Sequence, residues 1–120
     1  METLLIAEDS HSNFELLEAS AGRSFRKVLH AHNGLEAVEF CNTEKGIEIV
    51  LMDISMPEMN GYDATRIIRS ARPDLPVIAL TAYINDETEV MLRQSGFNAF
   101  LMKPFQLSEL MALIIKYKRG

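Results

Sequence analysis

The segment Ile47-Glu48-Ile49-Val50-Leu51-Met52-Asp53 is an almost continuous apolar run that ends in a carboxylate. Such a run is typical of a strand that is buried on both faces of a parallel sheet. Residues 77–80, Val-Ile-Ala-Leu, form a second run of this kind, directly after Pro73 and Pro76. Two doubly buried strands need helices on both sides of their sheet, so the sequence predicts an α/β fold.

Three further short apolar runs lie at residues 4–7, 28–31 and 99–102, and longer stretches with helical spacing separate the five runs. Asn33-Gly34 marks a turn before one helical stretch, and Gly96 ends another. A strand and a helix, repeated five times, predict a five-stranded parallel sheet with right-handed crossovers and helices on both faces. For a chain of this length we expect the flavodoxin-like strand order 2-1-3-4-5.

Length and composition fit one globular domain, which we expect to span residues 1–120. Apolar residues make up 48% of the chain and charged residues 24%. The net charge of −5 argues against direct binding to nucleic acid or to an anionic membrane, because both attract positive proteins. No apolar run approaches the roughly 20 residues of a membrane helix, and the acidic N-terminus does not resemble a signal peptide. We therefore expect a cytoplasmic location, with the single cysteine, Cys41, as a buried structural thiol.

Polar side chains directly follow four of the five predicted strands. Glu8 and Asp9 follow the first strand, and Asp53 ends the third. Thr81 follows the fourth strand and Lys103 the fifth. In open α/β sheets, ligands bind beyond the carboxyl ends of the strands, beside the point where the strand order reverses. These five side chains are therefore expected to converge at one edge of the sheet.

The residue types at this edge predict a phosphoryl site beside a divalent cation. Clustered carboxylates raise each other's pKa unless positive charge lies among them. Mg²⁺ binds one or two carboxylates together with water and phosphate oxygens, and Lys103 and Thr81 supply donors for a phosphoryl group. The alternative for any single residue is a solvated strand end, and Asp9 is equally well interpreted as the N-terminal cap of the following helix.

A longer motif surrounds Asp53. The segment Leu51-Met52-Asp53-Ile54-Ser55-Met56-Pro57-Glu58-Met59-Asn60-Gly61-Tyr62 contains the pattern Asp-x-x-Met-Pro-x-Met-x-Gly. Together with Glu8-Asp9, Thr81-Ala82 and Lys103-Pro104-Phe105, it resembles the receiver domain of response regulators in two-component phosphorelay signalling. The resemblance runs from the first strand to the last helix and covers nearly the whole chain.

This resemblance implies a role for each acidic residue. Asp53 would be the phosphoacceptor, and Mg²⁺ would be bound by Glu8, Asp9, Asp53 and the backbone carbonyl of Ser55. The family usually has Asp or Glu in the position of Glu8. No general base is needed, because the attacking carboxylate is already ionised.

The resemblance also implies a switch. Thr81 and Lys103 would bind phosphoryl oxygens, and movement of Thr81 would let the aromatic ring of Phe100 follow. The surface formed by the fourth helix, the fifth strand and the fifth helix would then change for partner binding. The Lys103-Pro104 bond is expected to be cis on the same resemblance. Tyr83, two residues after Thr81, is expected to shield the acyl phosphate from water.

The implied function is signal transduction rather than enzymatic turnover. The phosphoryl donor would be a phosphohistidine of a sensor histidine kinase or a histidine phosphotransfer protein, and the output would be a downstream protein target. The domain would assist only its own phosphorylation and dephosphorylation. We expect a free-standing receiver, because Met1 precedes the first strand so closely, although a receiver from a hybrid histidine kinase would look the same.

Three other functions remain open. A receiver-like binding module without phosphorylation would keep the same fold. An aspartyl-phosphate phosphohydrolase similar to haloacid dehalogenases would need Asp-x-Asp after the first strand and a cap domain, whereas this chain has Glu8-Asp9 there. A flavodoxin-like cofactor binder would need a Gly-rich or Ser/Thr-rich phosphate loop at that position. Three histidines, which lack any metal-like pairing, receive no functional role: His11, His30 and His32.

Overall fold

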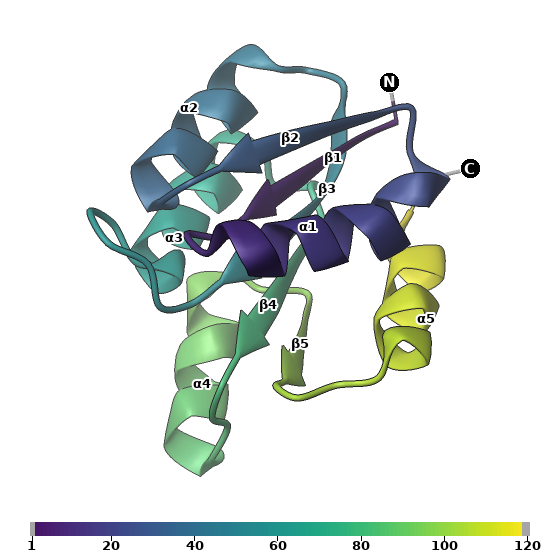
Figure 1. The fold of residues 1–120 in the computed structure, drawn as a ribbon. Helices are drawn as coiled ribbons and strands as arrows, with labels where there is room; N and C mark the ends of the chain where they lie inside the picture. Colours follow the sequence, from purple (N-terminus) through teal and green to yellow (C-terminus); the bar gives the residue numbers. More distant parts are fainter. Residues whose placement is uncertain (1, 119–120) are drawn as a thin grey trace.

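The computed structural model describes residues 2–118, and its strands and helices alternate along the chain (Figure 1). The strands are β1 (Thr3–Ala7), β2 (Lys27–Ala31), β3 (Ile47–Asp53), β4 (Val77–Thr81) and β5 (Ala99–Met102). The helices are α1 (His11–Ser20), the 3₁₀ helix η1 (Ala21–Ser24), α2 (Gly34–Thr43), α3 (Gly61–Ala71), α4 (Asp86–Ser95) and α5 (Leu107–Tyr117). Each strand agrees with its predicted apolar run to within one residue at either end.

All five strands pair in parallel in the order β2-β1-β3-β4-β5. This confirms the predicted α/β class and the flavodoxin-like strand order 2-1-3-4-5. Figure 1 shows α1 and α5 on one side of the sheet and α2, α3 and α4 on the other. Among residues 2–118, no helix is long and apolar enough for a membrane crossing.

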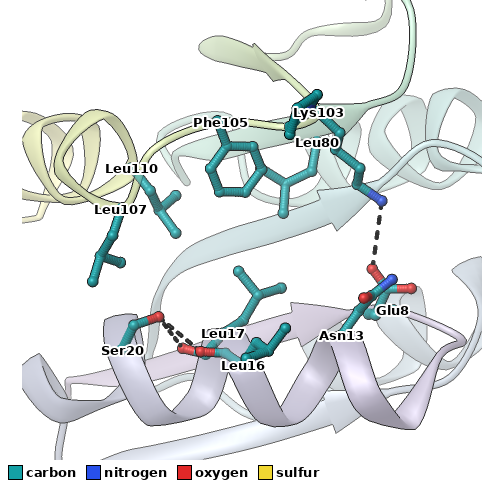
Figure 2. Close-up of a pocket in the computed structure, with 11 residues that line it drawn as sticks. Glu8, Asn13, Leu16, Leu17, Ser20, Leu80, Lys103, Phe105, Leu107 and Leu110 are labelled. Atoms are coloured by element: carbon teal, nitrogen blue, oxygen red, sulfur yellow. Dashed lines mark hydrogen bonds and ion pairs between the residues drawn. The ribbon is translucent and has the colours of Figure 1, made fainter.

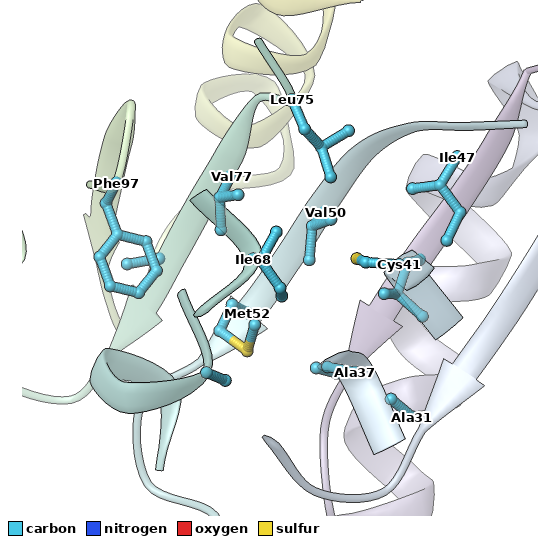
Figure 3. Close-up of a cluster of buried hydrophobic side chains, with 14 of the residues drawn as sticks. Ala31, Ala37, Cys41, Ile47, Val50, Met52, Ile68, Leu75, Val77 and Phe97 are labelled. Atoms are coloured by element: carbon cyan, nitrogen blue, oxygen red, sulfur yellow. The ribbon is translucent and has the colours of Figure 1, made fainter. Parts of the chain in front are cut away.

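The central strand β3 contributes to both hydrophobic layers. Val50 and Met52 pack against α2, α3 and α4 (Figure 3), whereas Ile49 and Leu51 pack against α1 and α5. All four side chains are fully buried. Cys41 of α2 is buried in the first of these layers, as expected, and burial raises the pKa of its thiol to about 11. The doubly buried strand predicted from the apolar run is therefore confirmed.

Three helices on the same side of the sheet have an asparagine as N-cap, directly before their first residue. The side-chain oxygens of Asn33, Asn60 and Asn85 each accept a hydrogen bond from the backbone N–H three residues further along the chain. These caps satisfy donors that a helix leaves free at its first turn. At the other end of α4, Gly96 adopts a φ of 102°, a left-handed conformation that favours glycine.

An arginine of α3 links the loops at the amino ends of β4 and β5. Arg69 Nη1 donates to the backbone oxygens of Pro73 and Leu75, at 2.8 and 2.7 Å. Arg69 Nη2 donates to the oxygen of Gly96 and to Asn98 Oδ1, each at 2.7 Å. Because these loops are far apart in sequence, the guanidinium fixes the end of the sheet opposite the carboxyl ends of the strands.

We expect Arg69→Leu to lower the free energy of unfolding by about 2–4 kcal/mol, because several carbonyl oxygens lose their donors together. Urea unfolding of purified protein measures the change. The control is Arg66→Leu, which breaks only the exposed ion pair with Asp63 and should cost about 0.2–1 kcal/mol. Equal losses of unfolding free energy in the two variants would show that the hydrogen bonds of Arg69 stabilise the fold no more than an exposed ion pair does.

Candidate functional site

The polar residues that follow the strands do converge at one edge of the sheet. Carboxylate oxygens of Glu8, Asp9 and Asp53 lie within 4.8 Å of one another. Lys103 Nζ lies 3.5 Å from Asp53 Oδ2 and 3.8 Å from Glu8 Oε1. Glu8 and Asp53 are only 1% and 6% exposed, whereas Asp9 is exposed. The ammonium of Lys103 thus pairs with two buried carboxylates, and the exposed carboxylate of Asp9 lies beside them.

Two glycines allow the loop after β3 to approach the rest of the site. A Cβ on Gly61 would lie 2.7 Å from the backbone oxygen of Asp53, and one on Gly34 would lie 2.2 Å from that of Met59. The N–H of Gly34 also donates to the Met59 oxygen at 2.9 Å. Within the loop, the N–H of Ser55 donates to Asp53 Oδ1 at 3.2 Å. The glycine that ends the motif around Asp53 is therefore required by backbone contact.

The surroundings of Glu8 perturb its carboxyl group. Burial raises its pKa to about 7, and the negative charge of Asp53 adds to this effect. A hydrogen bond from Ser10 N to Glu8 Oε2, at 3.1 Å, and the charge of Lys103 act in the opposite direction. Within residues 2–118, the buried Oε1 of Glu8 accepts no hydrogen bond. A buried carboxylate oxygen in this situation fits a metal ligand better than a structural group.

The first turn of α1 corrects one interpretation of Asp9. The N-cap of α1 is Ser10, whose hydroxyl accepts a hydrogen bond from Asn13 N at 3.3 Å. Asp9 is therefore not the helix cap. Its carboxylate lies instead with those of Glu8 and Asp53.

The hydroxyl of Thr81 lies at the same edge but is bound within its own loop. Thr81 Oγ1 donates to the backbone oxygen of Tyr83 at 3.2 Å and accepts from its N–H at 3.4 Å. The Tyr83 side chain, expected to shield the site, is 64% exposed and buries little surface in this conformation. Lys103 N donates to the Thr81 oxygen at 2.7 Å, and the Lys103-Pro104 bond is cis, as expected.

Phe100 lies in β5 and packs against α4. Its half-buried ring adjoins the hydrophobic layer on the side of α2, α3 and α4. The guanidinium carbon of Arg93 lies 5.4 Å from the ring centroid, and Arg93 Nη2 pairs with Glu89 Oε2 at 2.8 Å. The ring thus borders α4 without contacting the carboxylates.

A groove that was not predicted from the sequence lies between α1 and α5 and opens beside Lys103 (Figure 2). Its volume is about 460 Å³, and its walls include Leu16, Leu17, Phe105 and Leu107. Leu16 and Leu107 are 71% and 52% exposed. The signal in the sequence was weak, because a single exposed leucine on an amphipathic helix is common.

Comparison with known proteins agrees with this geometry. The family model described as "Response regulator receiver domain" matches residues 4–115. The chain is 35% identical over 111 residues to the probable transcriptional regulatory protein SilR of Salmonella typhimurium, covering 92% of this chain and 48% of SilR. It is 29% identical over 118 residues to the polar-differentiation response regulator DivK of Brucella anthropi, covering 97% and 95% of the two chains. The chain thus spans about half the length of SilR and 24% of ZraR of Klebsiella oxytoca, another curated relative.

Solved structures show the same fold. The signal receiver domain of a signal transduction histidine kinase from Syntrophus aciditrophicus superposes with a TM-score of 0.87 at 28% identity, covering 98% of this chain and 89% of that chain. The chemotaxis protein CheY4 of Vibrio cholerae also gives a TM-score of 0.87, at 23% identity and 98% coverage of both chains. Since the family model covers nearly the whole chain and its fold is the one described above, this chain belongs to the response regulator receiver domain family of two-component signalling.

Proposed function

We propose that this receiver domain accepts a phosphoryl group on Asp53 in a Mg²⁺-dependent step. The observation that carries the proposal is the placement of Asp53, which is nearly buried at the end of β3 with Lys103 Nζ 3.5 Å from its Oδ2. Asp53 attacks the phosphorus of a phosphohistidine, a P–O bond forms, and the P–N bond breaks with its electron pair on the imidazole. The product is an acyl phosphate.

The acidic residues fit Mg²⁺. Receiver domains bind Mg²⁺ through acidic residues, and Glu8, Asp9 and Asp53 offer oxygens within 4.8 Å of one another. The buried Oε1 of Glu8 has no hydrogen-bond donor among the described residues, and a hard cation would satisfy it. Glu8, Asp9, Asp53 and the backbone carbonyl of Ser55 would hold the ion. When bound, it would supply positive charge beside the transferring phosphoryl group.

Lys103 and Thr81 complete the proposed site. Lys103 Nζ already lies against Asp53 Oδ2, so it needs only a short movement to pair with a phosphoryl oxygen. The Thr81 hydroxyl would break its hydrogen bond to the Tyr83 oxygen and donate to a phosphoryl oxygen instead. This change of acceptor would draw the loop after β4 toward Asp53. Phe100 would then adjust against α4, which changes the surface formed by α4, β5 and α5 for a partner.

Receiver domains pair with histidine kinases and downstream effectors. The proposed phosphodonor here is a histidine kinase or a histidine phosphotransfer protein, and the proposed output is binding to a downstream protein. We assign residues 1–120 to one receiver domain that works in the cytoplasm and catalyses no reaction on a separate substrate. Direct nucleic-acid binding by this domain is not proposed, because its net charge is −5.

Incubation with acetyl phosphate and Mg²⁺ should add one phosphoryl group to the protein, as measured by intact mass. The Asp53→Asn variant should gain none, because its amide is not a nucleophile, and EDTA should prevent the reaction of the parent protein. The matched control is Asp63→Asn, an exposed aspartate of α3, which should react normally. A phosphoryl adduct on Asp53→Asn would contradict the assignment of the phosphoacceptor.

The stability of the metal-free protein should depend on the protonation of Glu8. The pKa of Glu8 is about 7 in the folded protein, whereas an unperturbed glutamate, as in the unfolded chain, has a pKa of 4.5. Between pH 4.5 and pH 7, the folded protein therefore binds more protons than the unfolded chain. The free energy of unfolding therefore decreases as the pH rises from 4.5 to 7, by roughly 2–3 kcal/mol in total. In EDTA, Glu8→Gln should gain stability relative to the parent by this amount between pH 4.5 and pH 8, measured by urea unfolding.

The exposed variant Glu18→Gln controls for the general loss of one negative charge. At pH 8, Mg²⁺ should stabilise the parent more than Glu8→Gln, because the variant lacks one proposed ligand. A stability difference between Glu8→Gln and the parent that is the same at both pH values would show that the burial of Glu8 carries no electrostatic cost.

A further inference from the structure

A histidine on β2 contacts the loop that carries two of the acidic residues. His30 Nε2 lies 2.7 Å from the backbone oxygen of Glu8. Because a carbonyl oxygen only accepts, Nε2 carries the proton and donates it to this bond. The same carbonyl belongs to the peptide unit between Glu8 and Asp9, so the hydrogen bond sets the orientation of the link between the two carboxylate-bearing residues.

The side chain of His30 supplies a hydrogen bond at the point where the sheet ends. The pairing of β1 with β2 stops at Ala7 and Ala31, and Glu8 N still donates to the Ala31 oxygen at 2.9 Å. Beyond that point, the Glu8 oxygen is bound by the imidazole of His30. Both polar groups of the Glu8 backbone are thus tied to β2, one by the main chain and one by this side chain.

Aromatic stacking holds the imidazole in place. The rings of Phe14 and His30 are parallel within 4°, with centroids 3.8 Å apart. On the other side, the His32 ring lies 4.0 Å away at an angle of 32°, and His32 Nδ1 pairs with Glu36 Oε1 at 2.9 Å. Phe14 is a buried residue of α1, so His30 connects β2 to both ends of the loop between β1 and α1.

We propose that His30 is a positioning residue for Mg²⁺ binding: its Nε2–H fixes the Glu8–Asp9 peptide so that the two carboxylates face Asp53. This inference rests on the proposed Mg²⁺ site. A donor held by stacking on Phe14 loses little freedom when Mg²⁺ binds, so the loop is already arranged for the ion. Loss of the donor leaves the Glu8 carbonyl free to turn toward water, and the two carboxylates then have to be ordered by the ion itself.

Four proteins test this role by Mg²⁺ titration, followed by NMR amide shifts at one fixed pH. His30→Phe keeps an aromatic ring against Phe14 but removes the donor. His30→Gln keeps an amide N–H at a similar reach, without the aromatic ring. His32→Phe changes the outer ring of the stack, which does not contact Glu8, and the parent protein provides the reference affinity. Thermal unfolding in EDTA separates an effect on Mg²⁺ binding from an effect on folding.

We expect His30→Phe to weaken Mg²⁺ binding roughly three- to tenfold, the range for loss of one hydrogen bond. His30→Gln, which keeps a donor but lacks the stacked ring, should recover only part of the lost affinity, and His32→Phe should stay within about twofold of the parent. A structural role alone would lower the unfolding temperature of His30→Phe with no change in Mg²⁺ affinity, and that result would overturn the proposal. Equal weakening by Phe and Gln at position 30 would also overturn it.

Imidazole nitrogen shifts of the parent protein give a second measurement that does not depend on the folding of a variant. A proton on Nε2 of His30 is expected, and a proton on Nδ1 alone would overturn the proposal. If the parent protein binds no Mg²⁺, the proposed metal site fails, and the role of His30 fails with it. If the parent and His30→Phe bind Mg²⁺ equally, only the role of His30 is excluded.

Discussion

The proposed chemistry of this domain depends on the ion pairs between Lys103 and the buried carboxylates of Glu8 and Asp53. One ammonium pairs with two buried carboxylates, and the exposed carboxylate of Asp9 lies beside them, so negative charge exceeds positive charge at this edge of the sheet. Burial makes this imbalance costly, as the raised pKa of Glu8 shows. A divalent cation would relieve the repulsion among the carboxylates. An incoming phosphoryl group would bring more negative charge, so the proposed transfer would need the same cation and Lys103 together.

The fold keeps this arrangement in place by fixing the two ends of the sheet differently. At the amino ends of β4 and β5, Arg69 donates to several carbonyl oxygens and to Asn98, which connects the two loops. At the carboxyl ends, close backbone contacts at Gly34 and Gly61 set the path of the loop after β3. The backbone of Thr81 is held by β5, whereas its hydroxyl is bound only to the backbone of Tyr83 in its own loop. In the proposed switch, the buried carboxylates would keep their places while the Thr81 hydroxyl changes its hydrogen-bond partner.

Much of this could be predicted from the sequence, because apolar periodicity and the position of polar residues after strands report burial and topology directly. The strand order and the convergence of Glu8, Asp53 and Lys103 follow from that pattern. The contacts of individual side chains do not. The interpretation of Asp9 as a helix cap was wrong, since Ser10 takes that position. His30 received no role, because neither its stacking on Phe14 nor its bond to Glu8, 22 residues away, leaves a local sequence signal.

The central claim is that the residues at this edge form one phosphoryl-binding site that is coupled to the surface of α4, β5 and α5. The most direct test is an NMR titration of the parent protein with beryllofluoride, a mimic of the phosphoryl group, in the presence of Mg²⁺. We expect amide shifts around Asp53, Thr81 and Lys103, together with shifts at Phe100 and along α4. Saturating beryllofluoride and Mg²⁺ that leave the resonances around Asp53 unchanged would contradict the claim.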